Sequence, residues 1–478
     1  MTGPFDFAAP VPGWATLGPV HLVAVGGIGM SAVARLLAAR GVRVSGSDAV
    51  DSPLLAALAA EGVRVHVGHD PAHLADARTV VVSSAVRPTN VELTQARRRG
   101  LRVLHRAQAL AAAMGSARRV AVAGANGKTT TTSLMVAALA AAGLDPSYAI
   151  GGELVSTGTN AHLGSPDLFV VEADESDGSF VVYHPDVAVV TSVQPDHLDH
   201  FGTFAAVVAA YRQFVESIRP GGLLVVCVDD SGAAQLGHWA RGRGVRVLGY
   251  GLAEGADARV REVALTGSRA RAVVDWAGRR IPLSLRIPGD YNLLNATAVL
   301  VAANAGLGAP IEDVVAGLGA FAGTRRRFEQ VGEAGGVRVV DDYAHNPAKV
   351  AAVVSTGRRL SGGGRLVVLF QPHLYSRTRD FAAEFGAALS PADAVVVMDV
   401  YAAREDPIPG VDAAMVVSAV RAARPECLVS VAPERSGLVA ALADLVLPGD
   451  LVLTVGAGDV TQVGPALVDL LRQRQAGR

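Results

Sequence analysis

The sequence contains very little cysteine. Its two cysteines, Cys227 and Cys427, stand far apart in a chain of 478 residues. Such spacing fits neither a disulfide framework nor a pair of metal ligands. We therefore expect two buried thiols in a protein of the reducing cytoplasm.

Long apolar runs and an excess of charge of one sign are also missing. No stretch approaches the ~18 uninterrupted apolar residues of a membrane-spanning helix, and residues 1–20 lack the basic start and apolar core of a secretion signal. The formal net charge is −1, so no extended basic surface for nucleic acid is expected. These absences predict a chain with no membrane and no nucleic-acid partner. We further expect small-molecule substrates and a monomer or a homodimer.

Aromatic residues make up only 5% of the chain, whereas 50% of its residues are hydrophobic. A composition dominated by Ala, Val, Leu and Gly suits layered α/β packing better than an aromatic-rich sandwich. At about 150 residues per domain, the length corresponds to roughly three domains. Together with the motifs described below, this places the domains at residues 1–114, 115–325 and 326–478.

Lysine is nearly absent, since only Lys128 and Lys349 occur among 43 Lys and Arg residues. Lys128 lies in a glycine loop at residues 124–130, between an apolar run that predicts a strand and a segment that predicts a helix. In such a loop, backbone N–H groups surround a phosphate, the lysine neutralises it, and the next hydroxyl reaches Mg²⁺. The glycine spacing is shorter than in the common phosphate loop, so an ordinary turn is the alternative. We interpret the loop as an ATP site.

A second glycine loop follows the predicted strand at residues 21–25. Gly27, Gly29 and Ala32 fit the dinucleotide fingerprint, and Asp48 comes about 20 residues later, after a second predicted strand at 42–44. The fingerprint does not distinguish NAD, FAD and UDP-sugars, and a tight βα turn is the alternative. It predicts a nucleotide diphosphate on the first helix.

An acidic cluster follows the buried-strand pattern at residues 168–171. The segment 172–177 reads EADESD, and its place downstream of a phosphate loop predicts a contact to Mg²⁺. A solvated acidic turn is the alternative. His197 follows another predicted strand and is either a metal ligand or a capped loop histidine.

Polar residues also occur where later elements begin or end. Asn292 and Asn295, three residues apart on a predicted helix, are placed to pair with an adenine edge, helix capping being the alternative. Four more predicted strands, at residues 337–340, 366–370, 394–398 and 451–455, all lead into polar loops. Ligands of open α/β sheets bind at this edge, so a site is expected there too.

In this order, and over nearly the whole chain, the motifs resemble those of the Mur ligases, and within that family the alanine-adding branch. The segments that carry the resemblance are residues 26–31, 45–48, 127–130, 172–180, 196–199, 326–328, 341–345, 370–373 and 456–459. The resemblance implies an α/β protein of three domains. These are an N-terminal Rossmann-like domain for a UDP-sugar, a central P-loop ATPase-type domain with a parallel sheet, and a C-terminal Rossmann-like domain that closes over ATP and the amino acid.

The activity implied by the resemblance is ATP-dependent amide ligation with Mg²⁺. ATP would phosphorylate the lactyl carboxylate of UDP-N-acetylmuramate, and the amine of L-alanine would attack the acyl phosphate, in the synthesis of peptidoglycan precursors.

The resemblance also implies roles for individual residues. Those assigned to catalysis are Lys128, His197, Arg377 and His345, and those assigned to Mg²⁺ are Thr129, Glu172 and His197. The contacts expected for ATP are Gly124, Asn126, Gly127, Lys128, Thr129, Thr130, Asn292, Asn295, Arg327 and Asp342. The contacts expected for the UDP-sugar are Gly27, Ile28, Gly29, Met30, Ser47, Asp48, Ser83 and Ser84.

Some positions depart from the family pattern, among them Ala125, Ser192, Asn346 and Leu374. Several departures belong to the substrate side, so two alternatives stay open. One is a ligase for another amine or a peptide, and the other is a sensor of UDP-sugar or ATP without activity. The residues expected for phosphate and metal, Lys128, Thr129, Glu172 and His197, are all present. A sensor without activity does not require them, so this alternative is disfavoured.

Overall fold

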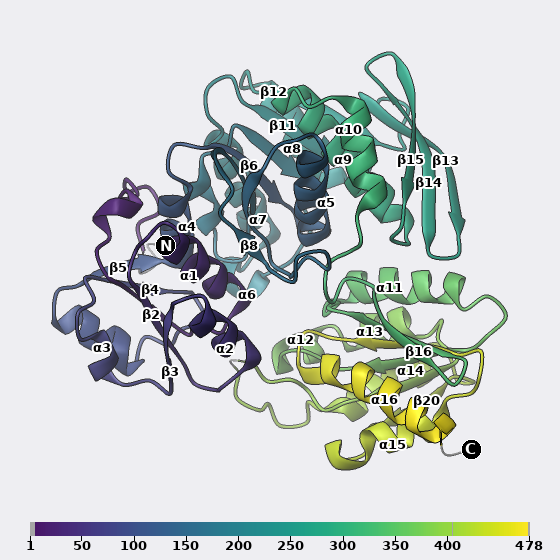
Figure 1. The fold of residues 1–478 in the computed structure, drawn as a ribbon. Coiled ribbons are helices and arrows are strands. Elements are labelled where there is room, and N and C mark those ends of the chain that lie inside the picture. The colour runs from purple at the N-terminus through teal and green to yellow at the C-terminus, as the bar shows by residue number, and fades with distance from the viewer. Residues whose placement is uncertain (1–4, 404, 477–478) are drawn as a thin grey trace. The chain divides into compact units, whose positions relative to one another are not determined.

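The computed structural model describes residues 5–403 and 405–476. By internal packing the chain divides into two compact units, Met1–Gly323 and Thr324–Arg478. Parallel strands dominate their sheets, and helices cover the sheet faces (Figure 1). The α/β class and the three predicted sheet-bearing regions are confirmed, with two of the sheets in the first unit.

The N-terminal sheet has five parallel strands in the order β3-β2-β1-β4-β5. The strands are β1 (Val20–Val23), β2 (Val44–Asp48), β3 (Arg64–Val67), β4 (Thr79–Val82) and β5 (Arg102–His105). The helices are α1 (Ile28–Ala39), α2 (Pro53–Ala60), α3 (Val91–Arg98) and α4 (Arg106–Met114). The strand order reverses between β1 and β4, where open α/β sheets bind ligands.

One strand of this sheet lies further along the chain than predicted. The expected strand at residues 42–44 is β2, Val44–Asp48, whose sequence VSGSD hides it because Gly, Ser and Asp are poor strand formers. Pairing with β1 on one side and β3 on the other fixes these residues in the sheet. Ser47 and Asp48 therefore belong to the strand itself.

The central sheet has ten strands in the order β15-β14-β13-β12-β11-β10-β6-β9-β7-β8. Those of its parallel part are β6 (Arg118–Ala123), β7 (Pro146–Ala149), β9 (Ser165–Glu172), β10 (Val187–Val190), β11 (Leu223–Cys227) and β12 (Arg246–Gly251). The short strand β8 (Ala161–His162) is antiparallel to β7. An antiparallel meander, absent from the sequence expectations, comprises β13 (Ala258–Thr266), β14 (Arg269–Trp276) and β15 (Arg279–Leu285).

Helices of the central region pack on this sheet and bury its faces (Figure 1). They are α5 (Lys128–Ala141), α6 (Leu198–Phe201), α7 (Phe204–Glu216), α8 (Ser231–Arg241), α9 (Asp290–Val301) and α10 (Ile311–Ala320). Strand β10 is buried along its whole length, as expected for a parallel strand covered on both faces. The carboxyl ends of β6, β9 and β10 therefore lie on a rigid scaffold.

The second unit has a six-stranded sheet in the order β16-β17-β21-β18-β19-β20. Its strands are β16 (Glu329–Ala334), β17 (Val337–Asp342), β18 (Leu366–Phe370), β19 (Ala394–Val397), β20 (Leu428–Val431) and β21 (Leu451–Val455), of which only β16 runs antiparallel to its neighbour. Its helices are α11 (Pro347–Leu360), α12 (Tyr375–Asp380), α13 (Ala382–Leu389), α14 (Ala413–Ala423), α15 (Arg435–Leu445) and α16 (Val463–Ala476).

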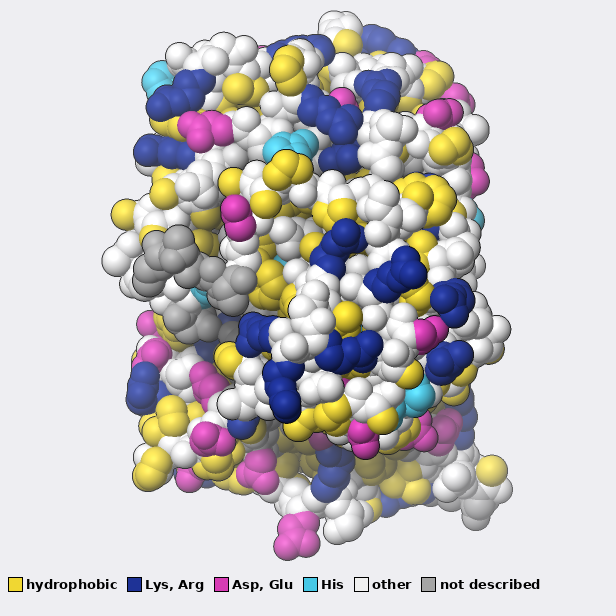
Figure 2. Space-filling view, turned by 90° about the vertical axis from the view of Figure 1, so that its left-hand side faces the viewer, with side chains coloured by type: hydrophobic (Ala, Val, Ile, Leu, Met, Phe, Trp, Pro, Cys, Tyr) yellow, Lys and Arg dark blue, Asp and Glu magenta, His cyan; other side chains and the backbone are white. Residues whose placement is uncertain are grey.

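No helix among the described residues has both the length and the apolar character to cross a bilayer. Figure 2 shows basic and acidic side chains spread over one face of the molecule with apolar side chains between them.

A buried carboxylate, not foreseen from the sequence, lies in the N-terminal region. Glu92 of α3 is fully buried. Its Oε2 accepts a hydrogen bond from the Ser47 hydroxyl at 2.5 Å and lies 3.0 Å from Nδ1 of His69. Its Oε1 lies 2.9 Å from Nδ1 of His73 and 3.5 Å from Nε2 of His21. Burial alone would raise the pKa of Glu92, but hydrogen bonds from His21, Ser47 and His73 lower it to about 2.

This carboxylate should make the stability of the fold depend on pH. A shift from 4.5 to about 2 corresponds to on the order of 3 kcal/mol of unfolding free energy. Because the pKa is lowered in the folded state, the contribution is present above pH 4.5 and is lost as the pH falls toward 2.

We expect Glu92→Gln to lower the unfolding free energy by about this amount at pH 7 and to flatten the acid dependence. Urea unfolding followed by circular dichroism checks this. The half-exposed Asp76, changed to Asn, serves as control, and an unchanged Glu92→Gln midpoint would contradict the assignment.

Candidate active site

The predicted phosphate loop connects the end of β6 to the first residue of α5. Gly124 and Gly127 have φ values of +138° and +82°, where residues with a side chain are strained. A Cβ atom at Gly124 would collide with Thr191, and one at Gly127 would lie 2.8 Å from Oδ1 of Asn295. Both positions therefore require glycine, and the loop is held tightly against its neighbours.

Lys128 begins α5 and points back over the loop. Its Nζ donates hydrogen bonds to the carbonyl oxygen of Gly124 at 2.6 Å and to Oε1 of Glu175 at 2.7 Å. Burial alone would lower the pKa of Lys128, but the nearby carboxylates of Glu175, Asp174 and Glu172 raise it above its ordinary value. The lysine is therefore positively charged at neutral pH, as phosphate binding requires.

Thr129 and Glu172 form an oxygen-rich pair beside the lysine. The Thr129 hydroxyl donates to Oε1 of Glu172 at 2.9 Å, and the backbone N–H of Gly151 donates to Oε2 at 2.6 Å. The structure thus brings two of the three predicted Mg²⁺ ligands together. The third, His197, contacts other carboxylates, with its Nε2 at 3.8 Å from Glu175 and 3.9 Å from Asp196.

The acidic segment after β9 links the two sheets of the first unit. Asp174 accepts a hydrogen bond from Arg106 at 3.0 Å, and Glu175 pairs with Lys128. Asp177 lies 3.2 Å from Nε2 of His105 and accepts a hydrogen bond from Ser84. Although burial raises the pKa of Asp177, these hydrogen bonds hold it well below its usual range. The segment is therefore a structured bridge between the two predicted nucleotide sites, not a solvated turn.

A chain of amide groups fixes the phosphate loop to β10 and α8. The Asn126 side chain donates to Oε1 of Gln194 at 2.9 Å, and Gln194 donates to Asp230 at the same distance. The Asn126 backbone N–H donates to the hydroxyl of Ser192 at 3.0 Å. Gln194 and Asp230 were not predicted as site residues. Their only signal in the sequence is that they follow the buried strands β10 and β11.

The two asparagines predicted to contact adenine, Asn292 and Asn295, lie on α9 next to the phosphate loop. Asn292 donates to the carbonyl oxygen of Pro288 at 2.6 Å, and Asn295 donates to Oδ1 of Asn292 at 3.2 Å. Helix α9 is preceded by Gly289 as its N-cap, so the alternative that these asparagines cap the helix is wrong. Asn295 instead packs against Gly127 and links α9 to the loop.

The glycine loop of the N-terminal sheet connects β1 to α1 and ends at Gly27, the N-cap, while Ile28, Gly29 and Met30 form the first turn of α1. Asp48 fastens this loop, since its Oδ2 accepts a hydrogen bond from the Gly26 N–H at 2.9 Å. Ser47 is fully buried, and its hydroxyl is committed to Glu92. Ser83 and Ser84 follow β4 at the point where the strand order reverses. The predicted contacts therefore gather at one edge of the sheet, although the hydroxyl of Ser47 faces inward.

The second unit carries its own polar cluster at the carboxyl ends of β17 and β18. Asp342 accepts hydrogen bonds from the N–H groups of Phe328 and Ala344 at 2.7 and 2.8 Å. Burial raises its pKa to about 6, against the lowering effect of Arg327 and these hydrogen bonds. The guanidinium of Arg327 lies 4.8 Å from the centre of the Tyr343 ring.

Arg377 and His345 belong to the same cluster. Arg377 approaches Nδ1 of His373 at 3.4 Å, and the rings of His373 and His345 are 5.7 Å apart. Burial and the nearby cations Lys349 and Arg377 hold the pKa of His345 well below its ordinary value. His373, which was not predicted, lies between the two predicted residues.

Two of the departures from the family pattern, Asn346 and Leu374, lie in this unit. Asn346 is the N-cap of α11, where its side chain accepts a hydrogen bond from the N–H of Lys349 at 2.9 Å. Leu374 is 5% exposed and has a φ of +70°.

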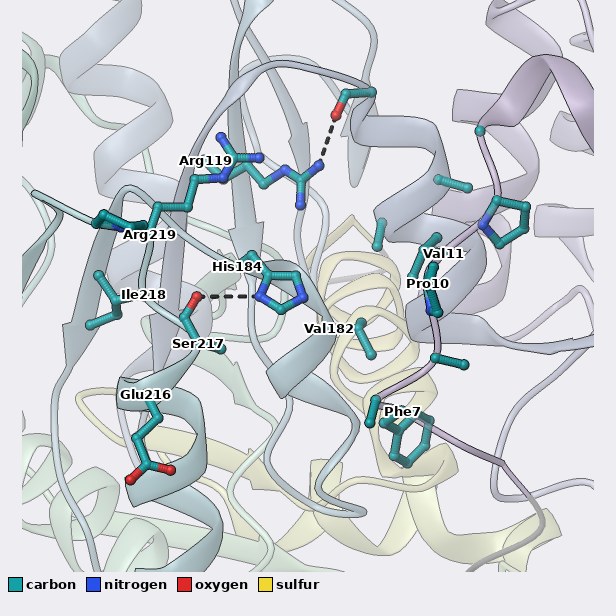
Figure 3. A pocket seen from close by; sticks show the side chains of 18 residues that line it. Phe7, Pro10, Val11, Arg119, Val182, His184, Glu216, Ser217, Ile218 and Arg219 are labelled. Carbon is teal, nitrogen blue, oxygen red and sulfur yellow. Dashed lines mark hydrogen bonds between the residues drawn. The ribbon is translucent and has the colours of Figure 1, made fainter.

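A hollow of ≈ 720 Å³ lies elsewhere in the first unit, between the N-terminal segment and the loop after α7 (Figure 3). Phe7 and Val11 line one side of it, and Arg119, His184 and Arg219 line the other. Arg119 donates to the carbonyl oxygens of Tyr183 and Gly115. The lining includes no residue predicted for the active site.

Family models and known relatives match the chain along its length. The models match as "Mur ligase family, catalytic domain" over residues 19–118, "Mur ligase middle domain" over 122–303 and "Mur ligase, glutamate ligase domain" over 326–458. The UDP-N-acetylmuramate–L-alanine ligase of Kineococcus radiotolerans is 56% identical over 99% of this chain and 100% of its own. The chain belongs to the Mur ligase family.

Other relatives agree with this assignment. The UDP-N-acetylmuramate–L-alanine ligase of Acidothermus cellulolyticus is 51% identical to this Mur ligase over 96% of each chain. The crystal structure of the UDP-N-acetylmuramate–alanine ligase of Thermotoga maritima superposes with a TM-score of 0.80 at 26% identity. The match covers 96% of this Mur ligase and 100% of the Thermotoga chain.

Proposed function

We infer that this Mur ligase joins L-alanine to the lactyl carboxylate of UDP-N-acetylmuramate at the expense of ATP, in the synthesis of peptidoglycan precursors. The observation that carries this inference is full-length similarity, at 48–56% identity, to eight ligases that bear this name. It favours alanine over the other amines and peptides left open by the sequence. We place the reaction in the cytoplasm, where ATP and nucleotide sugars are available.

We assign the ATP phosphates to the loop between β6 and α5. The N–H groups of the loop and the start of α5 would face the β- and γ-phosphates, and Lys128 would neutralise them. Asn292 and Asn295 on α9 would meet the adenine, since Asn295 packs against the same loop. The ribose of ATP is assigned to Asp342 of the second unit, and a further contact to ATP is assigned to Arg327 of the same unit.

The oxygen ligands at the end of β9 and the start of α5 suit Mg²⁺. The Thr129 hydroxyl and the Glu172 carboxylate are hard ligands of the kind that Mg²⁺ takes beside substrate phosphates. Among the described residues, no group of three or more His, Cys, Asp or Glu side chains is arranged to hold a metal unaided. Phosphate and water would therefore complete the coordination. We assign His197 to a second Mg²⁺, and bound Mg²⁺ would neutralise the charge that develops on the transferred phosphoryl group.

The UDP-sugar is assigned to the glycine loop between β1 and α1. Its diphosphate would lie on the N-terminus of α1, at Gly27, Ile28, Gly29 and Met30. The acidic segment contacts Ser84 and His105 at one end and Lys128 at the other, so it connects this site with the ATP loop. The lactyl carboxylate would lie beside this segment when it meets the γ-phosphate.

The amino acid is assigned to the polar cluster of the second unit. Arg377 offers a fixed cation for the carboxylate or the transferred phosphoryl group. His345 is held neutral by burial and by the nearby cations, so its imidazole can accept a hydrogen bond from the amino group, whose ammonium proton would pass to water. The acyl phosphate would then be attacked by a neutral amine, and phosphate would leave.

Product analysis tests the proposal directly. Incubation with UDP-N-acetylmuramate, L-alanine, ATP and Mg²⁺ should give one new UDP-linked product whose mass corresponds to an alanyl amide, together with ADP and phosphate. Omitting any one substrate should abolish the product. ATP hydrolysis without a new UDP-linked product would contradict the proposed ligation.

A further inference from the structure

Glu175 is a buried carboxylate to which the assignments above give no role. It lies in the acidic segment after β9, and its side chain is 3% exposed. Its Oε1 accepts the hydrogen bond from Nζ of Lys128 at 2.7 Å and lies 3.8 Å from Nε2 of His197. Glu175 therefore stands between the cation assigned to the ATP phosphates and the histidine assigned to the second Mg²⁺.

The other oxygen of this carboxylate is left over. Oε2 of Glu175 is buried and has no hydrogen-bond partner among the described residues. A buried acceptor without a donor is costly, so a cation or an ordered water is needed there. Carboxylate oxygens are the ligands that Mg²⁺ prefers, and Oε2 fits that role.

The ion pair between Lys128 and Glu175 must compete with the nucleotide. In this structure Nζ of Lys128 is directed at Gly124 and Glu175. When ATP phosphates attract Lys128, Glu175 keeps a buried charge without its partner, and an uncompensated buried charge is strongly unfavourable. A divalent cation beside His197 removes that penalty.

We propose that Glu175 exchanges partners during the reaction cycle. It pairs with Lys128 before ATP binds, and it then serves with His197 as a ligand of the second Mg²⁺. The inference rests on the proposed function, because it requires ATP in the phosphate loop. It follows that nucleotide and second metal bind cooperatively, each raising the affinity for the other.

The variant Glu175→Gln separates the two roles of the carboxylate by binding measurements on the full chain. In the variant Lys128 has lost its anionic partner and is free for phosphate. With EDTA present to remove metal, ATP should therefore bind the variant about tenfold more tightly than it binds the wild type, as measured by calorimetry. The same variant should lose one of two Mn²⁺ ions counted by electron paramagnetic resonance with a non-hydrolysable ATP analogue. Unchanged metal-free affinity or an undiminished Mn²⁺ count would overturn the proposal.

Two further variants keep the test sharp. Glu172→Gln, which removes a carboxylate that does not bond to Lys128, should lose a Mn²⁺ ion without the gain in metal-free ATP affinity. Glu175→Asp keeps the negative charge, but its shorter side chain holds the carboxylate further from the metal site. The second Mn²⁺ should therefore bind about tenfold more weakly, and an unchanged affinity would contradict the ligand role. If the wild type itself failed to bind ATP, the proposed function would fail, which is a different result from equal behaviour of wild type and Glu175→Gln.

Discussion

Lys128→Ala should abolish turnover while leaving the affinity for UDP-N-acetylmuramate nearly unchanged. The lysine is the cation of the phosphate loop, where Glu175 and Gly124 now hold it in place. Removing a charge that contacts the transferred phosphoryl group should slow the reaction by at least about a thousandfold. The sugar nucleotide is assigned to a different sheet, at the loop between β1 and α1. Phosphate release and calorimetric titration with the UDP-sugar measure the two effects.

Arg118→Ala provides the matched control for this variant. Arg118 is an exposed cation at the other end of β6, with one hydrogen bond to the carbonyl oxygen of Gly306. Its loss should leave turnover close to that of the wild type. Near-normal turnover of Lys128→Ala would remove the assigned role of the phosphate loop, and a parallel loss of UDP-sugar binding would point to a folding defect.

Glu172→Gln should give the second largest loss, roughly a hundredfold to a thousandfold in rate. The amide keeps the shape of the side chain and can still accept the hydrogen bond from Thr129, but it removes the negative charge assigned to Mg²⁺. Because the defect is in metal binding, the Mg²⁺ concentration for half-maximal activity should rise, and excess Mg²⁺ should restore part of the rate. A Mg²⁺ titration of phosphate release measures both quantities.

Asp167→Asn is the corresponding control on the same strand. Asp167 is exposed near the start of β9, whereas Glu172 ends the strand beside the phosphate loop. The control should show wild-type Mg²⁺ dependence. A Glu172→Gln enzyme that is slow but has an unaltered Mg²⁺ requirement would mean that Glu172 positions Thr129 and Gly151 rather than the metal.

The strands that the sequence predicted best are those buried on both faces. The runs at residues 366–370 and 451–455 match β18 and β21 residue for residue. A parallel strand covered by helices on both sides appears in the sequence as an uninterrupted apolar run. The polar strand β2 was misplaced because only its pairing with β1 and β3 marks it as a strand.

The loops of the site were predictable by their position, but the partners of their side chains were not. The sequence places Lys128 after β6 and the acidic segment after β9, and parallel strands bring those ends to one edge. It does not say that Glu175, rather than Glu172, holds the lysine, or that Asp177 meets His105. Such pairs depend on packing between distant segments. The burial of Glu92 among histidines could not be predicted for the same reason.

The central claim is that this Mur ligase selects L-alanine as the amine for UDP-N-acetylmuramate, and substrate competition tests it most directly. Phosphate release should be measured with UDP-N-acetylmuramate, ATP and Mg²⁺ while the amine is varied among L-alanine, D-alanine, glycine, L-serine and an L-alanyl peptide. The account predicts the highest kcat/KM for L-alanine, with no turnover when the amine is omitted. A higher kcat/KM for the peptide or for another amine, or phosphate release independent of any amine, would contradict it.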